Sequence, residues 1–256
     1  MTRRDAARHA AVLAAALAWL GAAAAQPGAQ ASVVALSSNG VRAALEVLAP
    51  QCERNIGRRV AIEYGTSASI RQRIAGGEPV DVAFVTQEVL DALGPSHAEP
   101  SSIARLGRAG IGVGIRAGAR RYDIGSAAAI KQALLSVRSV TYAQDGASRV
   151  HIERMFEQLG IAAEMKAKAL LEQGSVRAAA KVVAGDAEVL LTLVSEILPV
   201  EGMELLGPLP AEFQSYISFA AFVSSRPKDP SAAKAFLDCI AEPANAALFA
   251  EKGIER

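Results

Sequence analysis

The sequence lacks an excess of charge of either sign, because 27 lysines and arginines stand against 26 aspartates and glutamates. It also lacks any run of basic residues. A protein that binds nucleic acid through bulk charge needs such an excess. We therefore expect no nucleic-acid partner.

Residue types that hold metals and nucleotides are scarce as well. The chain has three histidines and two cysteines, and they do not have the spacing of a metal site. Gly110, Gly112 and Gly114 lie within strand-like sequence that no helix follows, unlike the glycines of a phosphate-binding loop. We therefore expect no metal and no cofactor.

The two cysteines, Cys52 and Cys239, each lie in a helical pattern. In an oxidising compartment they could form a disulfide, or each could be a small buried apolar residue. Sequence does not give the distance between them, so both alternatives stay open.

Long apolar runs are absent except near the N-terminus. Three arginines (Arg3, Arg4 and Arg8) precede an apolar stretch over residues 10–20, and alanines at 23–25 precede Gln26. This order is typical of a secretory signal peptide, and the stretch is short for a spanning helix. We predict a signal peptide over residues 1–25 and export to the periplasm. The alternative is an uncleaved membrane anchor.

Aromatic residues make up only 5% of the chain, whereas 51% of the residues are hydrophobic, which fits a core of Ala, Val, Leu and Ile. Strand-like runs alternate with helical periodicity, which predicts an α/β fold with mostly parallel sheets. The strand-like runs are 33–36, 60–64, 80–85, 112–115, 140–142, 189–193 and 219–223, and the helical runs are 41–48, 150–159, 176–184, 232–240 and 244–251. Gly160 and Gly185 are expected to end two of the helices.

Four serines stand at the start of helical runs: Ser38, Ser67, Ser148 and Ser175. This pattern is typical of helix N-termini that are capped by hydroxyl groups. Unpaired N–H groups and a partial positive charge make such termini ready anion sites. Each serine could also be a plain cap that binds no ligand. If several of them converge on one cleft, the sequence predicts a site for a small anion.

The block from residue 64 to residue 85, with Tyr64-Gly65-Thr66-Ser67 and the segment RIAGGEPVDV at 73–82, resembles the periplasmic molybdate-binding proteins. These are type II solute-binding components of ABC importers. The resemblance continues through residues 146–160 and 175–184 and into a helical tail at 235–237. It implies two α/β lobes joined by a two-strand hinge. Lobe I would hold residues 31–111 and 216–256, and lobe II residues 112–215.

In that family, serine hydroxyls and backbone amides at helix starts hold the oxyanion. The resemblance carries this role to Ser38 and Ser67 in the first lobe. In the second lobe it carries the role to Ser148 and to the backbone N–H of Val176.

The family's ligand tyrosine falls near Val194, and residues 193–196 contain no tyrosine. Thr192 and Ser195 are the alternative donors. Arg149 and Arg177, early in their helices, could instead clamp a carboxylate, or they could be solvated surface residues.

Residues 142–161 and 194–210 resemble a divergent branch of the family that includes periplasmic aconitate isomerase. Two functions follow from the resemblance. The first is a solute-binding protein that captures a molybdate-type oxyanion or an organic carboxylate for an ABC importer. The second is an isomerase of an unsaturated tricarboxylic acid on the same fold. A sensor subunit for a membrane kinase is a third possibility.

We favour the binding protein, with an inner-membrane ABC permease as its partner, and we expect a monomer. An isomerase would need a base for a carbon-bound proton. Tyr142, Asp145 and His151 lie near the expected cleft in sequence, but we assign no catalytic residue.

Overall fold

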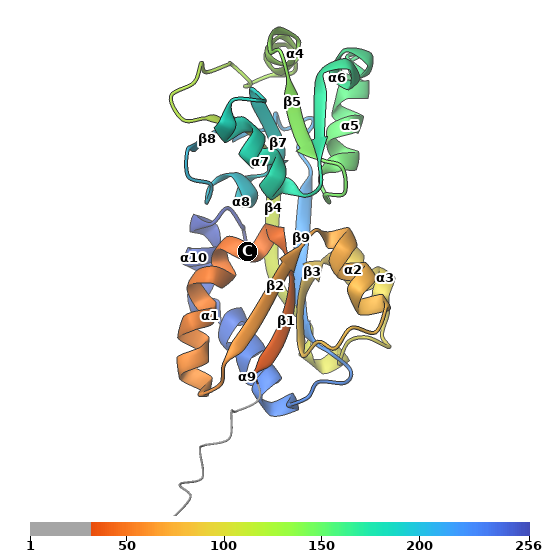
Figure 1. The fold of residues 1–256 in the computed structure, drawn as a ribbon, viewed down its shortest axis with the longest axis vertical. Helices are drawn as coiled ribbons and strands as arrows, with labels where there is room; N and C mark the ends of the chain where they lie inside the picture. The colour runs from red at the N-terminus through yellow and green to blue at the C-terminus, as the bar shows by residue number, and fades with distance from the viewer. Residues whose placement is uncertain (1–31) are drawn as a thin grey trace, which may run out of the picture. The chain divides into compact units, whose positions relative to one another are not determined.

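A computed structural model describes residues 32–256, so the signal peptide predicted at residues 1–25 lies outside the described residues. The first part of the fold is a sheet with the strand order β2-β1-β3-β9-β4 (Figure 1). Its strands are β1 (Val33–Ser38), β2 (Val60–Gly65), β3 (Val82–Thr86), β9 (Tyr216–Val223) and the beginning of β4 (Ala104–Arg116). Strand β1 pairs in parallel with β2 and β3, whereas β9 runs antiparallel to both β3 and β4.

The second part of the fold continues from the end of β4 in the order β4-β7-β5-β6, with β8 also paired to β4. Its further strands are β5 (Val140–Ala143), β6 (Ala169–Glu172), β7 (Val189–Leu193) and β8 (Met203–Pro208). Strand β5 pairs in parallel with β6 and β7, and β4 pairs antiparallel with β7 and β8. Parallel and antiparallel pairings are thus equally frequent, and the prediction of mostly parallel sheets was wrong. The difference arises because β4 and β9 run against their neighbours.

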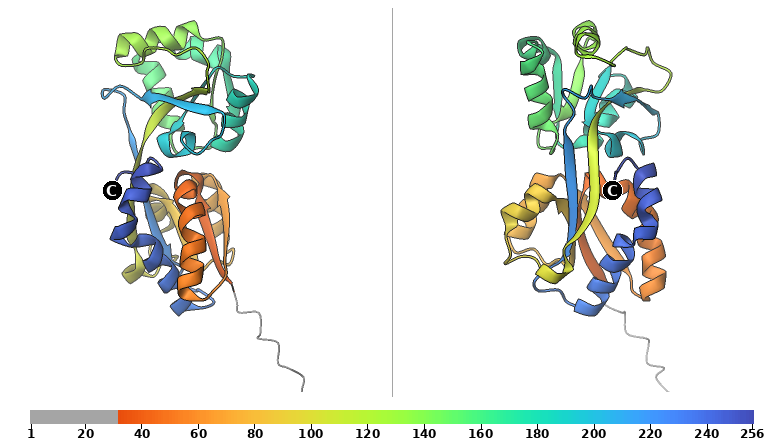
Figure 2. Two further views of the ribbon diagram at one scale, coloured as in Figure 1. Left: turned by 90° about the vertical axis from the view of Figure 1, so that its left-hand side faces the viewer. Right: turned by 180° about the vertical axis from the view of Figure 1, so that it is seen from behind.

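Strands β4 and β9 connect the two lobes (Figure 2). Strand β4 pairs with β9 from Ala104 to Gly110 and then with β7 from Ile111 to Ile115. A single strand therefore passes from one sheet to the other at Gly110 and Ile111, beside the start of β9. The chain is an α/β protein of two lobes joined by two strands, as the resemblance to the molybdate-binding family implied.

Helices flank both sheets (Figures 1 and 2). Those of the first lobe are α1 (Arg42–Ile56), α2 (Ser67–Ala75), α3 (Gln87–Leu93), α9 (Pro230–Ala241) and α10 (Ala246–Glu251), with short 3-10 turns η1 (Asn39–Val41), η2 (Pro100–Ser102) and η3 (Pro243–Asn245). Those of the second lobe are α4 (Ala127–Ser136), α5 (Arg149–Gln158), α6 (Ala162–Lys168), α7 (Ser175–Ala184) and α8 (Val194–Ile197). Each predicted strand and helix overlaps an observed one. The structure adds β6, β8, α3, α4, α6 and α8, and α2 begins at Ser67, where the sequence predicted a helix start.

Helix ends follow the glycines that the sequence singled out. Gly160 follows α5 with a φ of 66°, and Gly185 caps α7 with a φ of 85°. Both angles lie in the left-handed region that glycine adopts at low cost, so both helices end where the sequence predicted.

The core of the first lobe includes the contact between α1 and α9. Helix α1 buries Ala44, Leu45, Leu48 and Cys52, which recur at the spacing of one helical face. Cys52 forms a disulfide with Cys239 of α9, 187 residues further along the chain. Of the two alternatives left open by the sequence, the structure shows the disulfide. No helix in residues 32–256 is both long enough and apolar enough to span a membrane.

Candidate anion-binding cleft

A small cavity of about 20 Å³ lies where segments from both lobes meet. The segments follow the carboxyl ends of β1, β2, β5, β6 and β7, and β9 closes one side. The lining residues are Asn39, Gly40, Thr66, Ser67, Gly146, Ala147, Ser175, Leu193, Glu196 and Phe219. We call this space the central cavity. Open α/β sheets bind ligands at this edge, beyond the carboxyl ends of their strands.

Ser67 is the first residue of α2 and lines the central cavity. It does not cap the helix, because the cap residue is Thr66, whose Oγ1 accepts a hydrogen bond from the Ser69 N–H at 3.2 Å. The prediction that Ser67 is a cap was therefore wrong by one residue. The Ser67 hydroxyl is left available to a ligand.

Ser38 ends β1 and directly precedes Asn39 and Gly40 of the central cavity. Its side chain is 1% exposed, and its Oγ has no hydrogen-bond partner among the described residues. It stands at the cap position of η1 but makes no side-chain cap bond, in contrast to the prediction. A buried hydroxyl without a partner is unusual and costs free energy, which a ligand oxygen could offset.

Helix α7 begins at the cavity with Ser175, and Gly174 rather than Ser175 is its cap residue. Gly174 has φ 77° and ψ 154°, a conformation that is almost confined to glycine. Val176 is the second residue of the helix, and its backbone N–H belongs to the first turn, which has no intrahelical acceptors. The Val176 side chain is 54% exposed and borders a larger cavity described below.

The start of α5 differs from the serine-capped helix that the sequence predicted. Ser148 is buried at the cap position but makes no side-chain cap bond. Gly146 and Ala147, just before it, line the central cavity.

The two arginines proposed as carboxylate clamps lie outside the central cavity. Arg149 donates to Glu153 Oε1 at 2.8 Å and to the Gln144 carbonyl at 2.7 Å, so its guanidinium is already engaged. It borders a third cavity of about 380 Å³ between α2, α3 and α5. Arg177 is exposed and borders none of the three cavities described here.

Asp145 links the two lobes beside the central cavity. Its Oδ2 accepts a hydrogen bond from Thr66 Oγ1 at 3.2 Å, and its Oδ1 accepts one from the Gly174 N–H at 2.9 Å. One carboxylate therefore joins the cap of α2 to the turn that starts α7. Sequence reasoning had considered Asp145 only as a base.

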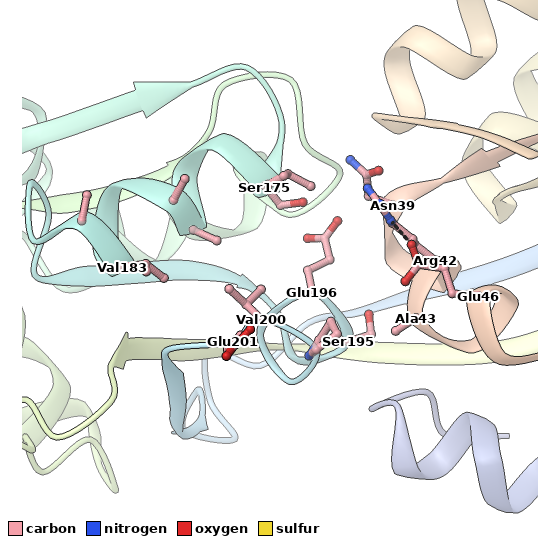
Figure 3. Close-up of a pocket in the computed structure, with 15 residues that line it drawn as sticks. Asn39, Arg42, Ala43, Glu46, Ser175, Val183, Ser195, Glu196, Val200 and Glu201 are labelled. Carbon is pink, nitrogen blue, oxygen red and sulfur yellow. Dashed lines mark hydrogen bonds and ion pairs between the residues drawn. The ribbon is translucent and has the colours of Figure 1, made fainter.

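Glu196 is a cavity-lining residue that was assigned no role from the sequence. It lies on α8, directly after β7, and lines both the central cavity and a larger cavity of about 550 Å³. Figure 3 shows its carboxyl group directed toward Ser175, with Asn39 on the opposite side. Its presence could have been anticipated, because Val194-Ser195-Glu196 follows a strand at the same sheet edge as the serines.

The Glu196 carboxyl is in an unusual electrostatic setting. Its Oε2 accepts a short hydrogen bond from Thr192 Oγ1. Burial raises its pKa above the ordinary value, and hydrogen bonds from Thr192, Ser175 and Leu193 oppose this shift. No ion pair involving Glu196 occurs within residues 32–256.

Tyr142 and His151, which were considered as bases together with Asp145, do not line the central cavity. Tyr142 is buried against Phe156, and burial raises its pKa. His151 has a buried Nδ1 without a hydrogen-bond partner in the described chain, and burial lowers its pKa. Within residues 32–256, no group of three or more His, Cys, Asp or Glu side chains is placed to hold a metal ion.

Comparison with known proteins identifies a matching family and a relative of similar sequence. Residues 33–255 match the family described as bacterial extracellular solute-binding proteins. A protein from a Pseudomonas species named aconitate isomerase is 30% identical over 231 residues, which are 88% of this chain and 87% of the relative.

Solved structures share the fold at lower identity. The periplasmic molybdate-binding protein of Azotobacter vinelandii has a TM-score of 0.75 and 17% identity, and the match covers 88% of this chain and 99% of that one. A sulfate-binding protein from Mycobacterium tuberculosis has a TM-score of 0.63 and 16% identity, over 88% of this chain and 86% of that one. Both likenesses concern the fold and confirm its type II periplasmic-binding-protein architecture.

Proposed function

Because the chain belongs to the family of bacterial extracellular solute-binding proteins, we propose that it captures a small anion in the central cavity. The anion is a molybdate-type oxyanion or an organic carboxylate. The observation that carries this proposal is the convergence of the starts of η1, α2, α5 and α7 on one cavity.

Helix N-termini hold an anion without a counter-cation. Their first N–H groups lack intrahelical acceptors, and the helix dipole adds a partial positive charge. Charge-assisted hydrogen bonds from such groups replace the water that the anion loses. In this site the hydroxyls of Ser38 and Ser67 and the backbone N–H of Val176 would be the donors, with Ser148 supporting the start of α5.

Capture by this fold involves movement of the two lobes. We place the hinge where β4 leaves β9 for β7, so that lobe I holds residues 31–111 and 216–256 and lobe II holds residues 112–215. The Thr66–Asp145 hydrogen bond joins the lobes in the present structure. A ligand drives closure only by as much as it binds the closed form better than the open form.

The biological setting follows from the family, whose members are exported. We propose that residues 1–25 are removed as a signal peptide and that the protein works in the periplasm as a monomer. The closed, loaded form would deliver its anion to an ABC permease in the inner membrane.

Thermal unfolding with a panel of anions tests the binding function. The panel holds molybdate, tungstate, sulfate, phosphate, citrate, cis-aconitate and trans-aconitate. A ligand at a hundredfold excess over Kd stabilises the folded protein by about 2.7 kcal/mol, which is a readily measured shift in Tm. Stabilisation by at least one anion is expected, and no stabilisation by any of them at millimolar concentration would contradict the proposal.

An isomerase of an unsaturated tricarboxylic acid is the second candidate, because the relative at 30% identity is named aconitate isomerase. Such a reaction removes a proton from one carbon and returns it to another, and it needs a titratable group at the cleft. Glu196 is the acidic side chain that lines the central cavity. Proton NMR of trans-aconitate incubated with the protein separates the two candidates, since only an enzyme converts it to the cis isomer.

A further inference from the structure

Glu196 is an acidic residue in a cleft whose other features favour the binding of an anion. Its carboxyl group lies between the start of α7 and η1, where Ser175 and Asn39 share both cavities with it (Figure 3). Glu196 is half-buried. Two negative charges in contact at such a site repel one another, because the protein screens them less than bulk water does. An ionised Glu196 would therefore oppose the binding of an anion in the central cavity.

Within residues 32–256, no basic side chain lines the central cavity, although Arg42 borders the larger cavity that Glu196 also lines. The elements packed against α8 include β4, β7, β8, η1, α1 and α7. The turn after α10 also approaches α8 at Gly253, and the neighbouring Lys252 pairs with Glu251 at 2.8 Å. Charged residues on or beside these elements include Arg42 and Glu46 on α1, Arg177 and Lys181 on α7, Arg108 and Arg116 on β4, Glu204 on β8, and Glu201 in the turn before β8. Strand β7 and η1 have no charged residue.

These groups are occupied or lie outside the central cavity. Arg42 pairs with Glu46 at 2.7 Å, and Lys181 pairs with Asp186 at 3.2 Å. Arg42, Glu46 and Glu201 border the larger cavity but not the central one. In the described chain, Glu196 therefore has no ion-pair partner, and no basic side chain lines the central cavity beside it.

We propose that Glu196 couples anion capture to the uptake of one proton, so that the loaded cleft holds the anion beside a neutral carboxylic acid that donates a hydrogen bond to it. The proposal deepens the anion-binding function proposed above and depends on it. In this proposal Glu196 is a specificity-determining hydrogen-bond donor. It lies near Val194, the position at which the family's ligand tyrosine was expected. A carboxylic acid, like a phenol, donates a hydrogen bond only while it keeps its proton.

Burial raises the pKa of Glu196 above its ordinary value in the free protein, so the carboxyl group takes up a proton more readily than an exposed glutamate does. An anion in contact with the carboxyl group raises that pKa further, since like charges disfavour ionisation. By linkage, protonation must then strengthen anion binding by the same factor. Affinity is greatest below the pKa of Glu196 in the free protein and falls as pH rises toward its higher pKa in the complex.

Calorimetric titration with molybdate and with trans-aconitate, from about pH 5 to about pH 9, tests the proposal. Wild-type affinity should fall by up to about tenfold per pH unit over part of this range. Titrations in buffers of different ionisation enthalpy should show uptake of a proton. In Glu196→Gln, an amide that always donates replaces the acid, so affinity should be retained and its pH dependence should be flattened.

Glu201→Gln is the matched control, because Glu201 borders the larger cavity only and should leave the wild-type pH dependence unchanged. Protonation of the ligand itself affects the titrations of wild type and of Glu196→Gln equally. It therefore cancels when the pH dependences of the two are compared. Binding without proton uptake, or an unchanged pH dependence in Glu196→Gln, would overturn the proton coupling while leaving anion capture intact. No binding of any anion of the panel at any pH would overturn both.

Discussion

At the scale of single residues, the hydroxyl groups near the cleft divide into two kinds. Thr66 uses its Oγ1 to cap α2 and to reach Asp145, so it supports the structure. Ser38 and Ser67 make no side-chain cap bond at their helix starts. Adjacent residues of similar chemistry should therefore respond differently to substitution.

We expect Ser67→Ala to weaken anion binding by about tenfold or more, because a hydrogen bond to a charged group contributes about 1.5–3 kcal/mol. Its free energy of unfolding without ligand should stay close to that of wild type. Thr66→Ala, the neighbouring control, should lose about 1 kcal/mol of stability even without ligand, since it removes a helix cap. Urea denaturation and ligand titration of both variants measure the two effects. Equal stability losses in the two variants would contradict the assignment.

At the scale of elements, the turn that starts α7 depends on Gly174. Its φ of 77° and ψ of 154° are strained for any other residue, and an added Cβ would lie 3.4 Å from Thr66 Cγ2 of the other lobe. We expect Gly174→Ala to cost about 1–3 kcal/mol of stability and to weaken ligand binding. Gly125→Ala, whose φ is not in this region, is the control for a glycine substitution as such. Thermal unfolding with and without ligand reports both quantities, and a Gly174→Ala variant as stable as wild type would count against this role.

The Cys52–Cys239 disulfide cross-links α1 to α9. A cross-link of this kind restricts the unfolded chain and typically contributes about 2–4 kcal/mol. We expect the double variant Cys52→Ala, Cys239→Ala to unfold at lower denaturant concentration by that amount. The bond lies away from the central cavity, so anion affinity of the folded variant should be unchanged. Guanidinium denaturation measures the first effect, and a variant with unaltered stability would refute it.

At the scale of the whole molecule, Asp145 connects the lobes through Thr66 and the start of α7. Asp145→Ala should shift the lobes toward an open arrangement and weaken anion binding several-fold, because only part of the population would be competent to bind. Small-angle scattering in saturating ligand should still show closure. A variant that binds as tightly as wild type would mean that Asp145 does not hold the closed form.

At this scale, the overall fold could be predicted from the sequence, but the details of the site could not. Alternating strand and helix periodicity was enough to predict the α/β class, since local hydrophobic pattern determines it, whereas the two lobes and their two-strand hinge were predicted from the resemblance to the molybdate-binding family. The helix caps were misplaced because the backbone angles of Thr66 and Gly174 are set by the loops that meet there. The role of Glu196 could not be predicted, because its neighbours Ser175 and Asn39 are distant in sequence and meet it only in the folded chain.

The central claim is that an anion sits among the converging helix starts of the two lobes. The most direct test is a crystal structure of the protein with the anion that gives the largest thermal shift. The account predicts ligand density in the central cavity, with oxygens at about 2.7–3.2 Å from Ser67 Oγ and from the Val176 backbone nitrogen. Density for the bound anion at any other place on the protein would contradict it.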